Sequence, residues 1–82
     1  MAVEADIYLT RSLQRDVFRR YVDAAQLEIN CMHGVVYVRG YVRKLRSHPE
    51  INLNEEVEVI KKLLRHHQGV REIIWEAEMM NN

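Results

Sequence analysis

The feature that most restricts the fold of this chain is a stretch from Leu27 to Val42 in which apolar and polar residues alternate. A period of two is typical of β-strands with one buried face, because successive side chains point to opposite sides of a strand. The alternation is interrupted at His33-Gly34, and two residues are enough for a tight hairpin turn. We therefore predict a β-hairpin with Gly34 at a positive φ in its turn.

An amphipathic helix is predicted before the hairpin. From Asp6 to Tyr21 there is no glycine or proline, and apolar residues recur at every fourth position, at Leu9, Leu13, Val17 and Tyr21. Side chains four residues apart lie on one face of a helix, so this stripe is expected to pack on a core. Asp6 is the expected N-cap.

A second helix is expected after a long connection. Residues 43–54 contain the only proline, Pro49, and are predicted to form a loop. Asn52 or Asn54 then caps the helix, because Asn52 and Glu55 have the spacing of a capping box. The inner stripe of this helix is formed by Val57, Ile60, Leu64 and His67.

The chain ends in a third predicted strand, Val70 to Met79, which follows Gly69, the expected C-cap of the second helix. A strand-helix-strand crossover makes this strand parallel to the second strand of the hairpin. The order is αββαβ, an α+β fold with a three-stranded mixed sheet and two helices packed on one face. The expected core consists of Leu9, Leu13, Val17, Ile29, Val36, Val38, Val42, Ile60, Leu64, Ile73 and Trp75.

Length and charge limit the size of the protein and its partners. Eighty-two residues suit a single domain, expected over 1–82 with its core at about 6–79. The chain has twelve basic and twelve acidic side chains. Because these cancel, binding to nucleic acid or to an anionic membrane would need a local patch.

The sequence gives limited evidence on the cellular compartment. Cys31 is the only cysteine, which excludes an internal disulfide and leaves too few thiolates for a structural zinc site. The N-terminus lacks a basic segment followed by an apolar run, and no stretch approaches the ~20 apolar residues of a membrane span. We expect a cytoplasmic protein as written, or a periplasmic or envelope one if the chain is a piece of a longer protein.

A regular spacing of apolar residues and glycines runs along the chain. It comprises Leu9-Thr10-x-x-Leu13-x-x-x-Val17, then Ile29-x-Cys31-x-His33-Gly34-Val35-Val36-Tyr37-Val38-x-Gly40-x-Val42, then Ile60-x-x-x-Leu64-x-x-His67-x-Gly69-Val70-x-x-Ile73. In this spacing the chain resembles the BON domain over roughly residues 6–79. Gly34, Gly40 and Gly69 match positions that this family marks.

The resemblance implies an αββαβ domain without catalytic residues or a cofactor, of a kind found mostly in bacterial envelope proteins. Such domains are associated with phospholipid contact, secretion and channel assembly. The resemblance therefore implies a binding or assembly module whose partner is a protein or an anionic lipid surface, and it leaves a homo-oligomer open.

Motifs for catalysis and for metal binding are missing from the sequence. There is no recognisable Ser-His-Asp or Cys-His signature and no glycine-rich phosphate loop. The four histidines, His33, His48, His66 and His67, could be considered as metal ligands. However, adjacent helical residues such as His66 and His67 point about 100° apart and do not easily share one ion. We predict a protein that is not an enzyme and that binds no metal.

The first candidate binding surface is the outer side of the helices. Arginines four residues apart lie opposite the apolar stripe of the first helix, and three further basic residues lie on the outer side of the second. Such a surface suits anionic headgroups, although a charge run is usually only a solvated face. The residues are Arg11, Arg15, Arg19, Lys61, Lys62 and Arg65.

The second candidate is the open face of the sheet, where Tyr37, Arg39 and Tyr41 point away from the helices. Such a row could stack on the bases of RNA or single-stranded DNA, which is our alternative function. Against it, acidic residues on the same face would repel phosphates. These are Glu28, Glu72, Glu76 and Glu78. A solvated face with Arg-Glu pairs across strands, or an apolar patch around Val35 and Ile74 that covers a partner, also fits the pattern.

Overall fold

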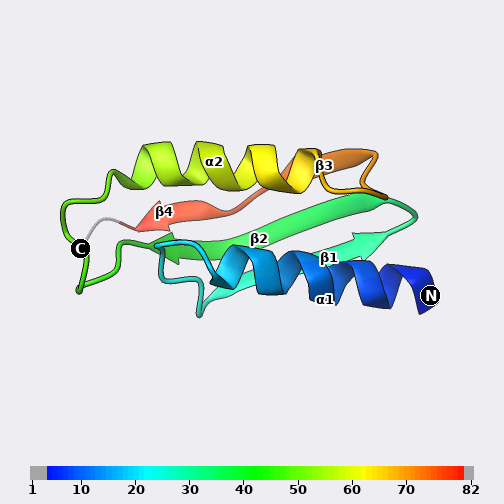
Figure 1. Ribbon diagram of the computed structural model, residues 1–82, viewed down its shortest axis with the longest axis horizontal. Coiled ribbons are helices and arrows are strands. Elements are labelled where there is room, and N and C mark those ends of the chain that lie inside the picture. The colour runs from blue at the N-terminus through cyan, green and yellow to red at the C-terminus, as the bar shows by residue number, and fades with distance from the viewer. Residues whose placement is uncertain (1–3, 81–82) are drawn as a thin grey trace.

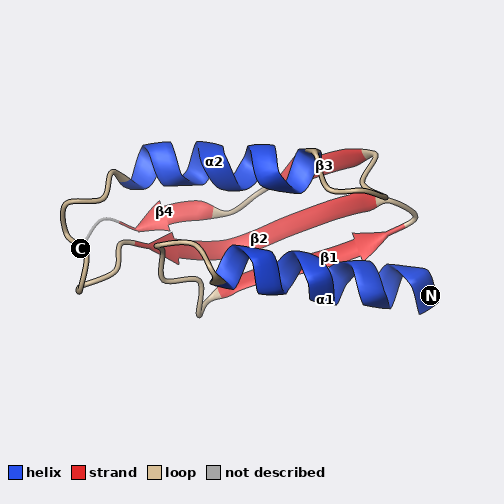
Figure 2. Cartoon of the chain, in the orientation of Figure 1, coloured by secondary structure: helices blue, strands red, loops and turns tan. Residues whose placement is uncertain are grey.

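The structure, a computed structural model, describes residues 4–80 and has an α+β fold (Figures 1 and 2). Two helices and a mixed sheet confirm the predicted fold class. The elements in chain order are α1 (Glu4–Phe18), β1 (Leu27–Met32), β2 (Val35–Arg43), α2 (Leu53–Arg65), β3 (Glu72–Trp75) and β4 (Glu78–Met80).

Strand β2 is the centre of the sheet. It pairs with β1 in antiparallel register, with Leu27 opposite Gly40 and Met32 opposite Val35. On its other side β2 pairs in parallel with β3 and β4. The molecule is elongated, 39 × 20 × 18 Å, and α1 and α2 run in opposite directions along its long axis (Figure 1).

The core lies between both helices and one face of the sheet, as the alternation predicts. Eight of the expected core residues are buried: Leu13, Val17, Ile29, Val36, Val38, Val42, Ile60 and Leu64. Leu9, Ile73 and Trp75 are partly buried and pack against this cluster. The core also includes residues outside the predicted stripes, among them Val22 and Ala24 before β1 and Leu53 at the start of α2.

The hairpin turn is also confirmed. His33 and Gly34 have φ values of 52° and 81°, and they join Met32 to its partner Val35. Positive φ at both central residues is the geometry of a turn whose twist matches that of the flanking strands.

The predicted third strand is in fact two short strands. Trp75 lies opposite Val38 and Glu78 opposite Tyr41, so β3 and β4 keep one register along β2 but are separated at Glu76–Ala77. The interruption faces Gly40, whose φ of 96° departs from the extended conformation of β2. An added Cβ at Gly40 would collide with the backbone oxygen of Gln26, so the chain needs glycine here.

The helix ends correct three further predictions. Asp6 is not an N-cap, because α1 already includes Glu4; its buried carboxylate instead accepts a hydrogen bond from His33 N at 3.1 Å. Tyr21 lies beyond the end of α1 and is 52% exposed. Helix α2 ends at the C-cap His66, three residues before Gly69, whose positive φ belongs to the following turn.

The start of α2 is as predicted. The side chain of Asn52 accepts a hydrogen bond from Glu55 N at 3.1 Å. This contact satisfies one of the amide groups that a helix leaves unpaired in its first turn.

Side chains of α1 cover the outer edge of β1. Thr10 Oγ1 accepts from Cys31 N at 3.0 Å, and Gln14 Nε2 donates to Ile29 O at 3.1 Å. Together with Asp6, these residues are spaced by four along α1 and therefore form one row over the strand. The row bonds backbone groups that an edge strand would otherwise offer to another chain.

Candidate functional site

The outward side of α1 is the most distinctive surface of the described chain. Arg11 and Arg15 are exposed there, as the periodicity predicts, and Arg19 is exposed directly after the last residue of the helix. Large apolar side chains lie beside them, with exposed fractions of 46% for Ile7, 66% for Tyr8 and 57% for Phe18. We call these six residues the α1 outer face.

Acidic groups do not neutralise the α1 outer face. Asp16 is the only acidic residue between Ile7 and Tyr21, and its carboxylate lies 3.6 Å from His67 on the side toward α2. None of the ion pairs formed among the side chains of residues 6–80 involves Arg11, Arg15 or Arg19. The surface therefore combines three uncompensated positive charges with apolar area.

The basic residues of α2 are in a different environment. The ammonium group of Lys61 lies 3.4 Å from Glu58 and 5.2 Å from the centroid of the Trp75 ring. Lys62 and Arg65 are exposed, but they share a shallow hollow with Glu58 and Val59. The outer side of α2 is thus a mixture of both charges, and the three arginines of α1 are the uniformly basic part of the expected six-residue surface.

The open sheet face carries a paired arginine between two tyrosines. Arg39 Nε lies 3.1 Å from Glu76 Oε1. This is an Arg-Glu pair across strands, as expected for a solvated sheet face. Tyr37 is half-buried and Tyr41 is 40% exposed. Because the central cation is occupied by a carboxylate, this row is poorly suited to a nucleic-acid backbone.

The side chains of Ser12, Asp16 and His67 lie close together, which the sequence did not predict. Ser12 Oγ lies 3.1 Å from His67 Nε2, and Asp16 Oδ2 lies 3.6 Å from the same nitrogen. Nδ1 lies 3.0 Å from Gln68 O, a carbonyl oxygen that can only accept. In a catalytic triad the carboxylate instead orients the second ring nitrogen, so this arrangement differs from one.

The other histidines lie apart from this cluster. His33 is in the hairpin turn, His66 caps α2, and the His48 ring packs on Tyr21 with 5.2 Å between centroids. Among the side chains of residues 6–80, no three His, Cys, Asp or Glu are close enough together to hold a metal ion.

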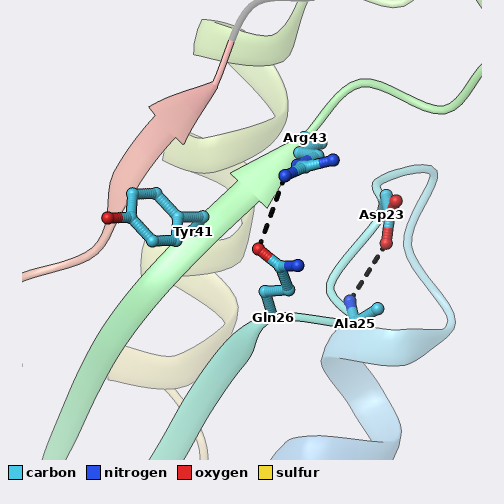
Figure 3. A pocket seen from close by; sticks show the side chains of 5 residues that line it. All are labelled: Asp23, Ala25, Gln26, Tyr41 and Arg43. Atoms are coloured by element: carbon cyan, nitrogen blue, oxygen red, sulfur yellow. Dashed lines mark hydrogen bonds between the residues drawn. The ribbon is translucent and has the colours of Figure 1, made fainter.

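A further site, which sequence reasoning missed, lies where β2 enters the long loop. A cavity of about 550 Å³ opens there, with Arg43, Lys44 and Arg46 among its lining residues. It adjoins a smaller pocket of about 40 Å³ that shares Asp23 and Arg43 with it (Figure 3). The sequence signal was present as a run of basic residues in residues 43–46, but only the structure shows that they surround a cavity.

Comparison of the chain with models of known protein families, with curated proteins and with solved structures gives no significant match. Within the described residues, neither helix is long and apolar enough to cross a membrane.

Proposed function

We propose that this chain is a non-enzymatic binding module of the BON type that associates with anionic lipid surfaces through the α1 outer face. The observation that carries the proposal is the composition of this face, which has three exposed arginines that form no ion pair among residues 6–80 and three large apolar side chains. Helices that lie at a membrane interface combine these two properties, because cations attract anionic headgroups and apolar side chains enter the acyl boundary.

The resemblance to the BON domain is supported by backbone geometry. The three glycines that match the family spacing, Gly34, Gly40 and Gly69, all have positive φ values. The elements also follow the αββαβ order, with the last strand divided in two. Neither observation identifies a ligand, so the lipid assignment depends on the α1 outer face.

The charge of the face favours binding to an anionic surface, and its apolar side chains add to this. A basic side chain near an anionic surface contributes about 1 kcal/mol, so three arginines contribute about 3 kcal/mol, or roughly a hundredfold in affinity. Tyr8 and Phe18 add the burial of apolar area. Because the whole chain has no net charge, this local surface must account for the binding.

Sedimentation with vesicles tests the proposal. The protein should pellet with phosphatidylcholine vesicles that contain phosphatidylglycerol at low salt, and it should be released as the ionic strength rises. The triple variant Arg11→Gln, Arg15→Gln, Arg19→Gln should lose this pelleting at an unchanged melting temperature, because all three side chains are exposed.

A matched control removes the same number of charges elsewhere. Lys62→Gln, Arg65→Gln, Arg71→Gln changes three exposed basic residues outside the α1 outer face and should leave pelleting unchanged. Retained binding in the arginine variant, or no binding by the parent protein at low salt, would contradict the proposal and leave a protein partner as the alternative.

A further inference from the structure

The connection between β2 and α2 lines an open cavity with basic side chains. Its volume of about 550 Å³ is in the range of small-molecule sites, roughly 300–1,000 Å³. The lining contains three cations and one carboxylate, which leaves two positive charges in excess. The lining residues are Asp23, Arg43, Lys44, Leu45, Arg46, Ser47 and Pro49.

Asp23, which supplies the carboxylate of this cavity, is held by hydrogen bonds to other parts of the chain. Asp23 Oδ1 accepts a hydrogen bond from Ala25 N at 3.0 Å, and the Asp23 backbone pairs with Arg43 in both directions at 2.8 and 3.0 Å. Arg43, Lys44 and Arg46 take part in none of the ion pairs within the described chain. No ion pair among the described residues therefore neutralises these cations, and with Asp23 in the lining two positive charges remain in excess.

The Arg43 side chain in the cavity lining is only partly satisfied by hydrogen bonds within the protein. Its Nε atom is buried and has no hydrogen-bond partner in the part of the chain whose side chains are described, residues 6–80. Its Nη2 atom makes one long contact, 3.5 Å to Gln26 Oε1, on the side of β2 away from the Tyr41 ring (Figure 3). A buried donor without an acceptor is unfavourable, so the Arg43 guanidinium has hydrogen-bonding capacity that the protein does not use.

The loop that carries the other cations is held in place by its own contacts. His48 N donates to Leu45 O and Ile51 N donates to His48 O, each at 3.2 Å. Ser47 Oγ lies 2.9 Å from His48 Nδ1, and the His48 ring packs on Tyr21. These contacts order the loop backbone next to Lys44 and Arg46 before any ligand binds, which lowers the entropic cost of binding.

We propose that this cavity binds a phosphomonoester group through Arg43, Lys44 and Arg46. A phosphomonoester carries a charge of about −1.5 to −2 near neutral pH, which matches the two excess positive charges of the lining. The planar fork of a guanidinium fits two phosphate oxygens, and lysine adds a point charge. The site is separate from the α1 outer face and does not depend on the function proposed for it.

An NMR titration of the ¹⁵N-labelled protein with glycerol 3-phosphate tests the site. We expect saturable chemical-shift changes at the amides of residues 43–48 and none with glycerol. Lys44→Gln, Arg46→Gln should weaken binding by roughly tenfold to a hundredfold for each charge-assisted hydrogen bond lost, without lowering the melting temperature, because both side chains are exposed. Arg71→Gln, an exposed cation outside the cavity, is the control.

A second arm distinguishes a soluble ligand from a lipid headgroup. Vesicles of phosphatidylcholine with phosphatidic acid present the same phosphomonoester on a membrane, and the Arg11→Gln, Arg15→Gln, Arg19→Gln variant removes pelleting through α1. If that variant binds glycerol 3-phosphate, the ligand is a soluble phosphomonoester. If it does not bind glycerol 3-phosphate but pellets with the phosphatidic acid vesicles, and if the further substitutions Lys44→Gln, Arg46→Gln abolish this pelleting, the ligand is a lipid headgroup. No binding in either arm, shifts outside the loop, or full affinity in the Lys44→Gln, Arg46→Gln variant would overturn the proposal.

Discussion

Arg20, just after α1, holds Glu56, in the first turn of α2, through a two-pronged ion pair. Arg20 Nε donates to Oε1 at 2.9 Å and Nη2 donates to Oε2 at 3.1 Å. The Glu56 side chain is only 12% exposed. This pair ties the two helices near the start of α2, and the contacts of His67 with Ser12 and Asp16 tie them beyond its end.

Loss of the Arg20–Glu56 pair should destabilise the fold more than loss of a surface pair. Removing one partner leaves the other charge poorly solvated, so we expect Glu56→Ala to cost about 1–3 kcal/mol. In a double-mutant cycle with Arg20→Ala, the coupling energy should exceed that of Arg39 and Glu76, whose side chains are 63% and 54% exposed. For that surface pair we expect about 0.2–1 kcal/mol. Equal coupling in the two cycles would contradict this prediction.

Gly40→Ala should be among the most damaging small substitutions. The new Cβ would meet the Gln26 backbone at a left-handed φ, so we expect a loss of about 2–5 kcal/mol in a urea titration. Gly69→Ala is the control, since it has a similar φ of 94° but meets only the Leu9 side chain, at 3.3 Å. Its cost should be about 1–2 kcal/mol, and a control as damaging as Gly40→Ala would show that the clash is unimportant.

Alkaline pH should destabilise the protein through Cys31. Burial raises the pKa of the Cys31 thiol above its ordinary value; a hydrogen bond with the Gly34 backbone opposes the shift and the charge of Asp6 adds to it. Because the folded pKa is the higher one, the stabilisation is complete below the unfolded pKa of roughly 8.5 and is lost as pH rises through the folded pKa. In urea titrations from pH 7.5 to 10.5, the stability advantage over Cys31→Ala should shrink. A constant difference between the two proteins would show that the thiol does not titrate differently on folding.

The α1 side chains over β1 should limit self-association. In Thr10→Val, Gln14→Ala the edge loses an acceptor for Cys31 N and a donor for Ile29 O, at about 1 kcal/mol for each hydrogen bond. We also expect concentration-dependent association in sedimentation velocity, because the edge is then open to pairing. Arg15→Ala, on the α1 outer face, should remain unchanged in this assay; association in both proteins would point to a different surface.

The repeating patterns of the sequence predicted most of the fold. The alternation in residues 27–42 placed Val36 and Val38 in the core, and the two-residue turn fixed Gly34. Burial of a regular face leaves a periodic trace that can be read locally. The division of the last strand into β3 and β4 was not predicted. It lies opposite the positive φ of Gly40 on the neighbouring strand β2, and the pattern of the last strand itself contains no sign of that geometry.

The polar contacts between distant residues could not be predicted. Asp6 was assigned to its own helix end, but it bonds a turn that follows 27 residues later in the chain. Ser12 and His67 are 55 residues apart, and nothing periodic links them. The basic run in residues 43–46 was visible, yet a cavity depends on the course of the loop in space, which local patterns do not encode.

The covered edge of β1 also determines which edge of the sheet can pair with another copy of the chain. Backbone pairing between copies can use only the edge formed by β3 and β4, because α1 side chains already bond the other. A sheet with one available edge per copy can join a second copy about a two-fold axis, and then both available edges are used. Pairing through strands therefore stops at two molecules, and a growing fibre would need α1 to leave β1 first.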